Sequence, residues 1–181
     1  MKRRSVLQAA LVLLVSCKPS GQVTDLDGHA IDPFAGNAPV TVLVFVTTSC
    51  PISNRYAPEI QRLADAFAAR GGKTYLVYPS ASDTPGAIRD SLREHSLSVA
   101  AVRDPAHLLV RRASVTVTPE AAVFHGGELA YHGRIDDRQV DFGIARPAAT
   151  RHDLEDAVQR VLAGASPEES STTAIGCSIA M

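Results

Sequence analysis

Two different spacings of apolar side chains stand next to each other near the start of this chain. Residues 40–46 (VTVLVFV) are an almost continuous apolar run rich in β-branched residues. Such a run is typical of a central strand that is buried on both faces. Over residues 54–70 the apolar positions instead recur at helical spacing, and Gly71 and Gly72 end the pattern. The chain therefore predicts a buried strand that leads almost directly into an amphipathic helix.

The rest of the chain continues this alternation of strands and helices. Further strands are predicted at residues 73–78, 99–102, 121–124 and 129–132, and further helices at residues 84–94, 105–112 and 152–162. The last two strands are joined by His-Gly-Gly-Glu at residues 125–128, which is a hairpin signal. This order predicts an α/β fold with a central mixed sheet flanked by helices. The parallel part should have right-handed crossovers, and the hairpin should add an antiparallel edge.

The two ends of the chain differ from this middle part. Residues 1–16 have a basic start followed by a short apolar run, which predicts a secretory signal too short to span a membrane. Residues 17–37 predict a tether and a short edge hairpin, and residues 38–164 the folded domain. Residues 165–181 are rich in Ser, Thr, Pro and Glu, and they predict a flexible tail that carries Cys177.

The composition limits the classes of function. With 181 residues the chain suits one domain, and 45% hydrophobic with 20% charged residues excludes wholesale disorder. A formal charge of −1 gives no basic field for nucleic acid. Aromatic residues make up only 5%, without any Trp, so a base-stacking surface is not expected either. We therefore predict no nucleic-acid partner.

The signal-like segment ends in a sequence that bears on location. Leu14-Val15-Ser16-Cys17 resembles a bacterial lipobox. By that resemblance Cys17 becomes the acylated first residue of an exported lipoprotein, which the acyl chains hold at a membrane facing the periplasm or the cell exterior. The alternative is an ordinary secretory signal with an incidental cysteine. Export would place the two other thiols in an oxidising compartment.

The second of the three cysteines, Cys50, stands where the buried strand gives way to the helix. At a helix N-terminus the free N–H groups and the helix dipole stabilise a thiolate, which is the reactive form of a cysteine. Pro51 suits the first helical position because its missing N–H would be unpaired there anyway. Cys50 is therefore a candidate nucleophile, and the alternative is a buried, inert cysteine at a strand end.

Several stretches of this chain resemble a known superfamily. FVTTSCPISNRYAPEIQRL around Cys50 is similar to the active-site segment of the thioredoxin-like superfamily, and especially of its redoxin (AhpC/TSA) proteins and lipoproteins. The segment Thr118-Pro119-Glu120-Ala121 resembles the cis-proline loop of that superfamily. GRIDDRQVDFG and the terminal AIGCSI resemble a redoxin subgroup. The resemblance implies a thioredoxin-like fold, with a cis peptide bond before Pro119 and a loop that packs against Cys50.

The chain also departs from the patterns of this superfamily. A dithiol oxidoreductase has a second cysteine where this chain has Ser53, and Ser53 cannot resolve a mixed disulfide. Peroxiredoxins carry a Pro and a Thr before the cysteine. Here Thr47 keeps the Thr position and could orient a peroxide, whereas Leu43 stands in place of the Pro. Each of the two chemistries is therefore half supported.

The last cysteine, Cys177, is either a free mobile thiol or the thiol that resolves Cys50. Residues 165–176 can span up to ~40 Å when extended, whereas a domain of this size has a radius of gyration of ~15 Å. The tail can therefore reach Cys50. The residues around Cys177 are apolar for a tail, which suggests that they dock in a groove.

The other candidate site residues carry weaker signals. We expect Pro51, Ser53, Arg55, Thr118 and Arg134 to line the site, beside the catalytic set of Cys50, Cys177, Thr47 and Pro119. Arg55 could support the thiolate or lie on a solvated helix face. Arg134, Asp136 and Asp137 could line the site or form turns and ion pairs. The six His residues show no metal-ligand spacing, so neither a metal nor a cofactor is predicted.

Three functions remain open at this point. The first is a membrane-anchored thiol oxidoreductase in which Cys50 attacks a disulfide of a partner protein or a peroxide. The second is a copper-handling chaperone that uses Cys50, Cys177 and a His, since Cu(I) favours thiolates. The third is a non-catalytic lipoprotein that uses the fold as an interaction module.

Overall fold

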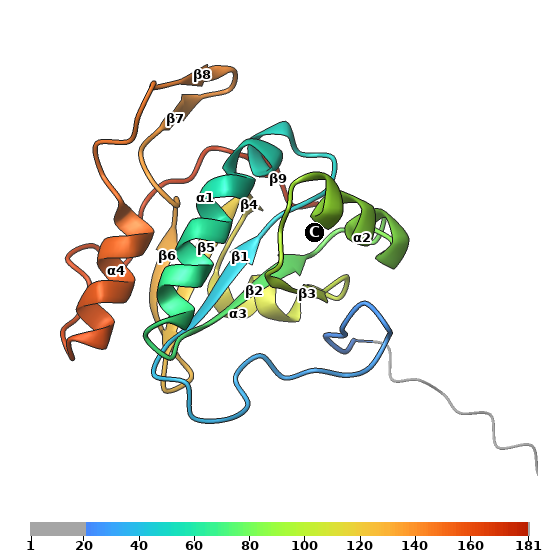
Figure 1. Ribbon diagram of the computed structural model, residues 1–181, viewed down its shortest axis with the longest axis horizontal. Coiled ribbons are helices and arrows are strands. Elements are labelled where there is room, and N and C mark those ends of the chain that lie inside the picture. Colours follow the sequence, from blue (N-terminus) through green and yellow to red (C-terminus); the bar gives the residue numbers. More distant parts are fainter. Residues whose placement is uncertain (1–20, 181) are drawn as a thin grey trace, which may run out of the picture.

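A five-stranded mixed sheet forms the centre of the computed structural model, which describes residues 21–180 (Figure 1). The strand order is β3 (Ala100–Arg103), β2 (Lys73–Tyr78), β1 (Thr41–Phe45), β5 (Glu120–His125) and β6 (Glu128–Gly133). The first three strands are parallel, and β5 pairs with β1 and with β6 in antiparallel fashion. The predicted α/β class, with its mixed sheet and antiparallel hairpin, is confirmed.

The central strand β1 is buried along its whole length, as its apolar run predicts. Because successive side chains of a strand point to opposite faces, β1 contributes to two cores. Val42 and Val44 pack in the core on one side of the sheet, and Leu43 and Phe45 pack in the core on the other side. The end of β1 is thereby fixed between two packed layers.

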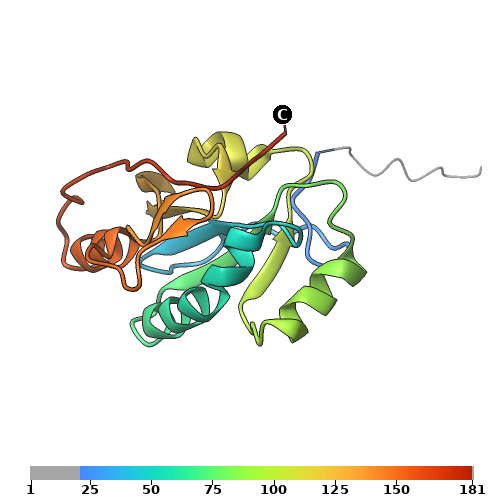
Figure 2. The ribbon, with the colours of Figure 1, turned by 90° about the horizontal axis from the view of Figure 1, so that it is seen from above.

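Helices cover both faces of the sheet (Figure 2). One face carries α1 (Pro51–Ala68), α2 (Pro85–Glu94) and α4 (Asp153–Leu162), whose apolar side chains share one core. The other face carries the short helix α3 (Leu108–Ala113) and part of the segment that precedes β1. None of the helices in the described range is long and apolar enough to cross a membrane.

Four short strands lie outside the central sheet. A two-residue strand, β4 (Val117–Thr118), pairs with β9 (Cys177–Ser178), and β7 (Gln139–Asp141) pairs with β8 (Ile144–Ala145). The sequence does not predict these elements, because two or three residues are too few to show a period of two. The β7–β8 hairpin projects from the body of the molecule beside the start of α1 (Figure 1).

The segment after Gly164 returns across the domain in two steps. The N–H of His132 on β6 donates to the carbonyl of Ser170, and the N–H of Thr172 donates to the carbonyl of His132, at 3.0 and 3.1 Å. Five residues later, Cys177 begins β9. The segment is thus attached first to β6 and then to β4. The predicted signal segment, residues 1–16, and the predicted lipidation site Cys17 lie outside the described residues.

Candidate active site

Cys50 caps the first turn of α1. Its backbone is extended, with φ −85° and ψ 113°, and Pro51 follows as the first helical residue. The Cys50 side chain is only 1% exposed. The N–H of Cys50 donates to the carbonyl of Thr47, and the N–H of Asn54 donates to the carbonyl of Cys50. The strand-to-helix transition therefore holds the Cys50 sulfur at the helix N-terminus, as the sequence pattern predicts.

The loop before β5 lies against this sulfur. The peptide bond between Thr118 and Pro119 is cis, as the resemblance to the thioredoxin-like superfamily implies. The Cys50 thiol donates to the carbonyl of Thr118 at 3.1 Å. Thr47, at the end of the β1 region, lies with its Oγ1 3.4 Å from Oγ1 of Thr118. The structure thus brings Cys50, Thr47 and the loop containing Pro119 together.

Cys177 reaches the same place from the far end of the chain. The sulfur atoms of Cys177 and Cys50 are 2.7 Å apart, although the two residues are 127 positions apart in sequence. Both cysteines are free thiols in this structure. No movement of the backbone is needed to bring the two sulfur atoms into reach of each other.

Backbone pairing with β4 holds Cys177 in position. Cys177 stands opposite Thr118 in the β4–β9 ladder, and the N–H of Ile179 donates to the carbonyl of Thr116 at 2.9 Å. Gly176 makes this close approach possible, since a Cβ there would lie 2.2 Å from the carbonyl oxygen of Thr118. The residue before Cys177 must therefore be a glycine for the strand to dock as it does.

The two thiols have pKa values shifted in opposite directions. Burial raises the pKa of Cys50, but the hydrogen bond from Cys177 and the N–H and hydroxyl of Ser53 outweigh burial, so the pKa of Cys50 lies below its ordinary value. Burial, the hydrogen bond to Cys50 and the charge of Cys50 raise the pKa of Cys177 to about 11. The first thiolate of the pair therefore forms on Cys50, which the sequence marks as the nucleophile.

The remaining predicted site residues lie at different distances from the sulfur atoms. Pro51 and Ser53 belong to the first turn of α1, next to Cys50. Arg55 is exposed, and its Nη1 lies 3.4 Å from Oε1 of Gln139, so its described contact is to the β7–β8 hairpin. Arg134 pairs with Asp153 at the start of α4, with Nε and Oδ2 2.7 Å apart. Arg55 and Arg134 therefore tie neighbouring elements together.

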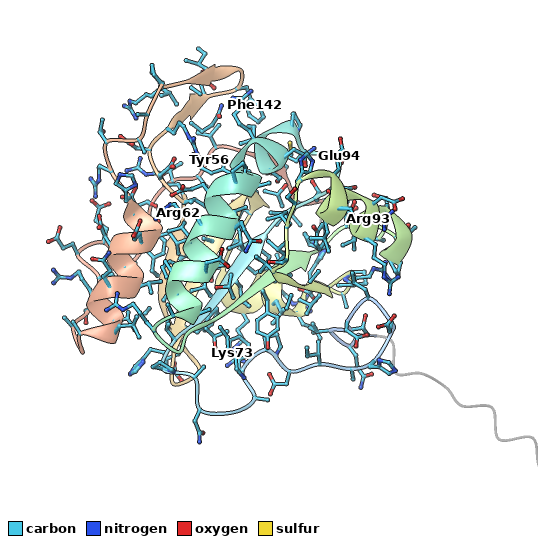
Figure 3. All side chains as sticks on the ribbon, viewed as in Figure 1. Tyr56, Arg62, Lys73, Arg93, Glu94 and Phe142 are labelled. Carbon is cyan, nitrogen blue, oxygen red and sulfur yellow. The ribbon has the colours of Figure 1, made fainter. Side chains whose placement is uncertain are left out.

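The segment GRIDDRQVDFG, residues 133–143, connects four parts of the molecule. The Tyr56 hydroxyl on α1 donates to the buried carboxylate of Asp136 (Figure 3). The carboxylate of Asp137 accepts hydrogen bonds from Arg146 and from the hydroxyl and N–H of Thr150. The hydrogen bonds to Thr150 and Arg151 and the positive charge of Arg146 hold the pKa of Asp137 well below its usual range. Of the two interpretations left open for Asp136 and Asp137, these contacts favour turns and ion pairs.

Several residues that hold the site do not stand out in the sequence. Glu120, only 4% exposed, accepts hydrogen bonds from the N–H groups of Thr116 and Val117 and so supports β4. Its only signal is an acidic residue at the start of an apolar strand. The Thr172 hydroxyl contacts the Tyr131 hydroxyl at 2.6 Å and accepts from the N–H of Arg134 at 3.1 Å. A threonine in a polar tail gives no signal for this role.

The described residues contain two groups that could offer three or more ligands to a metal ion. These groups are Asp25, Asp27 and His29, and Glu59, His152 and Glu155. Neither contains a cysteine. Within residues 21–180, no His, Asp or Glu joins Cys50 and Cys177 in a cluster of three ligands. The paired thiols therefore differ from the three-ligand copper site that the second hypothesis requires.

We compared the sequence and the fold of this chain with those of known proteins. No protein-family profile and no curated protein matches the chain. The structure is similar to that of an uncharacterised conserved protein from Geobacillus kaustophilus, with a TM-score of 0.75, 22% identity, and 89% of this chain and 88% of that chain covered.

Two further similar structures belong to proteins with named functions. A thioredoxin domain of a thiol-disulfide oxidoreductase from Bacteroides vulgatus has a TM-score of 0.56 and 14% identity, with 78% of this chain and 91% of that chain covered. A secreted disulfide oxidoreductase from Mycobacterium tuberculosis has a TM-score of 0.54 and 19% identity, with coverage of 78% and 93%. The chain has a thioredoxin-like fold.

The thiols of this chain are not arranged as a Cys-x-x-Cys motif. The second thiol comes from β9 at the far end of the chain, and the position three residues after Cys50 holds Ser53. The predicted thioredoxin-like fold is thus confirmed. The AhpC/TSA type is a finer assignment that the fold does not decide.

Proposed function

We propose that this protein is a thiol-disulfide oxidoreductase in which Cys50 is the nucleophile and Cys177 the resolving thiol. The observation that carries this proposal is the 2.7 Å contact between the two sulfur atoms at the N-terminus of α1. Similar structures whose proteins have named functions are disulfide oxidoreductases, which supports the same class of reaction.

The reaction proceeds in two exchange steps. The Cys50 thiolate attacks one sulfur of a substrate disulfide, so that a Cys50–substrate disulfide forms and the other substrate sulfur leaves as a thiolate. The Cys177 sulfur, having lost its proton, then attacks Cys50. The Cys50–Cys177 disulfide forms and the second substrate sulfur leaves as a thiol. The substrate gains two electrons and the cysteine pair loses two. Two external thiols of a partner then restore the pair and become a disulfide themselves.

The contacts of the site give each neighbouring group a role in these steps. The Thr118 carbonyl accepts a hydrogen bond from the Cys50 thiol at 3.1 Å, and backbone pairing with β4 holds Cys177 next to Cys50. The raised pKa of Cys177, about 11, keeps this residue a thiol while Cys50 is a thiolate. Burial is the largest cause of this raised pKa, and the hydrogen bond to Cys50 and the charge of Cys50 add to it. Once Cys50 has entered a mixed disulfide it carries no charge, so that contribution is gone and Cys177 loses its proton more readily than before the first step.

Peroxide reduction is the second candidate reaction, and one contact favours it. Thr47 lies beside the site with its Oγ1 3.4 Å from Oγ1 of Thr118, where a hydroxyl could orient a peroxide. The Cys50 thiolate would attack one peroxide oxygen and become a sulfenic acid, and the other oxygen would leave as an alcohol or water. Attack by Cys177 would then give the same disulfide and release water. Copper handling and a non-catalytic role have no comparable contact in their favour.

We also propose where in the cell the protein is located, and this proposal starts from the sequence. The lipobox resemblance at Cys17 supports an exported protein anchored in a membrane by lipid. The similar M. tuberculosis protein is described as secreted, which agrees with export.

The experiment compares the full-length protein with Cys50→Ser and Cys177→Ser. Each reduced protein is mixed with oxidised glutathione or with hydrogen peroxide, and thiol-driven turnover is followed. We expect Cys50→Ser to lose both reactions. Cys177→Ser should stop after one turnover, with a glutathione adduct or a dimedone-reactive sulfenic acid on Cys50. Turnover in Cys50→Ser at the wild-type rate would overturn the proposal.

A further inference from the structure

A buried hydroxyl beside the reactive sulfur has no hydrogen-bond partner among the described residues while Cys50 is a neutral thiol. Ser53 is 4% exposed, and its Oγ is buried without a partner. Buried hydroxyl groups are nearly always hydrogen-bonded, and leaving one unpaired costs about 1–3 kcal/mol. An unpaired hydroxyl three residues after the candidate nucleophile therefore needs an explanation from the chemistry of the site.

The position of Ser53 on α1 directs it toward Cys50. Cys50 is the residue that caps the helix, and Ser53 is the third residue of its first turn. At this position the N–H of the third residue points back at the side chain of the capping residue. Pro51 has no N–H to offer. Ser53 therefore presents both its N–H and its hydroxyl on the side of the helix end where the Cys50 sulfur lies.

The state of the Cys50 sulfur decides whether these donors have an acceptor. In the structure Cys50 is a thiol that donates to the Thr118 carbonyl, and α1 has no side-chain capping hydrogen bond. A neutral thiol sulfur is a weak acceptor, whereas a thiolate carries a full charge and accepts strong hydrogen bonds. The unpaired hydroxyl thus acquires a partner when Cys50 ionises.

We propose that the Ser53 hydroxyl stabilises the ionised Cys50 sulfur by hydrogen bonding, so that Ser53 activates the nucleophile. This inference rests on the proposed function of Cys50. In this scheme Ser53 is the hydrogen-bond donor to the Cys50 sulfur, while Cys177 is the resolving group. The two tasks are divided between a residue on α1 and a residue on β9. The pKa of Cys50, which Ser53 helps to lower, agrees with this division.

The test is the pH dependence of Cys50 alkylation in the reduced full-length protein. The peptide that contains Cys50 is quantified by mass spectrometry after short exposure to iodoacetamide at a series of pH values. A hydrogen bond to a charged group supports a shift of about one pH unit. Ser53→Ala should therefore raise the midpoint of the Cys50 profile by about one unit and slow alkylation about tenfold below the midpoint. Ser53→Thr, which keeps a hydroxyl, should restore the wild-type midpoint.

Ser49→Ala is the matched control, because it removes the same group from the exposed residue on the other side of Cys50. It should leave the midpoint unchanged. The cavity of about 10 Å³ that Ser53 lines together with Thr47 and Tyr78 has room for about one water. If a solvent molecule there is the only partner of the hydroxyl, Ser53→Ala will leave the Cys50 midpoint at the wild-type value, and the proposal is overturned.

Thermal unfolding at two pH values separates activation from a structural role. A lowered pKa in the folded state stabilises the fold above the ordinary thiol pKa, and that contribution disappears as the pH falls. Ser53→Ala should therefore be at least as stable as the wild type at pH 5, where the hydroxyl of the wild type is unpaired, and less stable at pH 9. An equal loss at both values would assign Ser53 to the fold and overturn the proposal.

The same data distinguish this inference from the proposed function. An acidic Cys50 midpoint in both wild type and Ser53→Ala would leave Cys50 as the nucleophile and exclude Ser53. A wild-type midpoint at the ordinary thiol value would contradict the activation of Cys50 itself.

Discussion

The two sulfur atoms in contact belong to residues with different electrostatic surroundings. Cys50 lies at a helix N-terminus, whereas Cys177 lies on a two-residue strand and faces the sulfur that ionises first. Because one proton leaves the pair before the other, the two thiols titrate as a coupled system. The order of ionisation gives Cys50 and Cys177 different chemical roles although their sulfur atoms are in contact.

This difference predicts two separate alkylation profiles. In the reduced protein, the alkylation rate of Cys50 should level off below the ordinary thiol value of about 8.5. The rate of Cys177 should keep rising toward its pKa of about 11. The measurement is the pH at half-maximal rate for each cysteine, which does not depend on how accessible each sulfur is. Coincident midpoints near the ordinary thiol value would contradict the prediction.

A second prediction concerns the single residue Gly176. Gly176→Ala places a Cβ 2.2 Å from the Thr118 carbonyl oxygen, so β9 must move away from β4. Overlap of this kind costs about 1–3 kcal/mol, which lowers the ratio of docked to undocked β9 about fivefold or more. After oxidation, peptide mapping should find correspondingly less Cys50–Cys177 disulfide.

Gly86→Ala is the control for this substitution. Its added Cβ would meet only Oγ1 of Thr84, at 3.9 Å, on the exposed side of α2. The yield of disulfide should stay at the wild-type level. An unchanged yield in Gly176→Ala as well would show that β9 docking does not depend on the glycine.

At the residue scale the sequence predicts those features that a strong local pattern defines. Cys50 stands out because a buried strand and an amphipathic helix flank it. The contact of Cys177 with Cys50 could be predicted only as possible, since chain length permits it and does not require it. The roles of Gly176 and Thr172 depend on contacts with residues 58 and 41 positions away, which no local pattern contains.

Among the elements, the segment after β6 fixes the surroundings of the site. Asp136 binds α1, Asp137 binds the loop before α4, and Gln139 accepts from Arg55. The β7–β8 hairpin that follows exposes three large apolar side chains, Val140, Phe142 and Ile144, of which Phe142 is visible at the edge of the molecule (Figure 3). The buried carboxylates of Asp136 and Asp137 therefore anchor the β7–β8 hairpin, whose large apolar side chains face solvent.

Asp137→Asn tests this anchoring. Because the pKa of Asp137 is lowered in the folded protein, its contribution to stability is present above the ordinary Asp value of about 3.9 and is lost as the pH falls below it. The variant should lose about 2 kcal/mol of unfolding free energy at pH 7, as hydrogen bonds to a charged group would give. The loss should shrink below pH ~4. Denaturant unfolding at pH 7 and pH 3 measures both values.

Asp141→Asn serves as the comparison on the same hairpin. The Asp141 carboxylate is exposed and accepts from the N–H of Phe142. Its removal should change the unfolding free energy by less than about 0.5 kcal/mol. A similar loss in both variants would indicate a general effect of charge on the hairpin.

The predicted elements of the central sheet agree with the structure because each has enough residues to show its period. The boundaries shift by up to about three residues. α1 begins at Pro51 although its apolar spacing becomes clear only from residue 54, and α3 begins at Leu108 although a helix is predicted from residue 105. The strands β4, β7, β8 and β9 escape prediction because tertiary pairing, and not an apolar face, defines them. The sequence thus predicts the part of the candidate site that lies at the start of α1, and it does not predict the part that lies on β9.

For the molecule as a whole, the C-terminal segment acts as a cover over the reactive sulfur. Its anchor at residues 170–172 lies on β6, and its end lies on β4 beside Cys50 (Figure 1). Cys50 is 1% exposed in this closed arrangement. We therefore expect a bulky substrate to reach Cys50 only after residues 173–180 move.

Removal of residues 173–181 should open the site without unfolding the sheet. If the closed arrangement is favoured by ~1.4 kcal/mol, Cys50 should react about tenfold faster with a bulky aromatic disulfide reagent. The rate with hydrogen peroxide should change less, because a small oxidant needs less room. The rates are measured by stopped flow on Cys177→Ser, which keeps the segment, and on the truncated chain, which lacks it. In both proteins Cys50 is the one thiol at the site. Equal acceleration for both oxidants would indicate that the segment does not act as a size-dependent cover.

The separation of 127 positions between Cys50 and Cys177 also affects how the protein is made. A chain grows by roughly 5–20 residues per second, so Cys177 is added on the order of ten seconds after Cys50. Throughout that interval Cys177 is not available as a partner for Cys50. A product that stops before residue 177 would still contain the whole central sheet, yet its Cys50 would lack this partner and could be joined to other molecules. Disulfide formation between Cys50 and Cys177 would thus mark the chains that extend as far as β9.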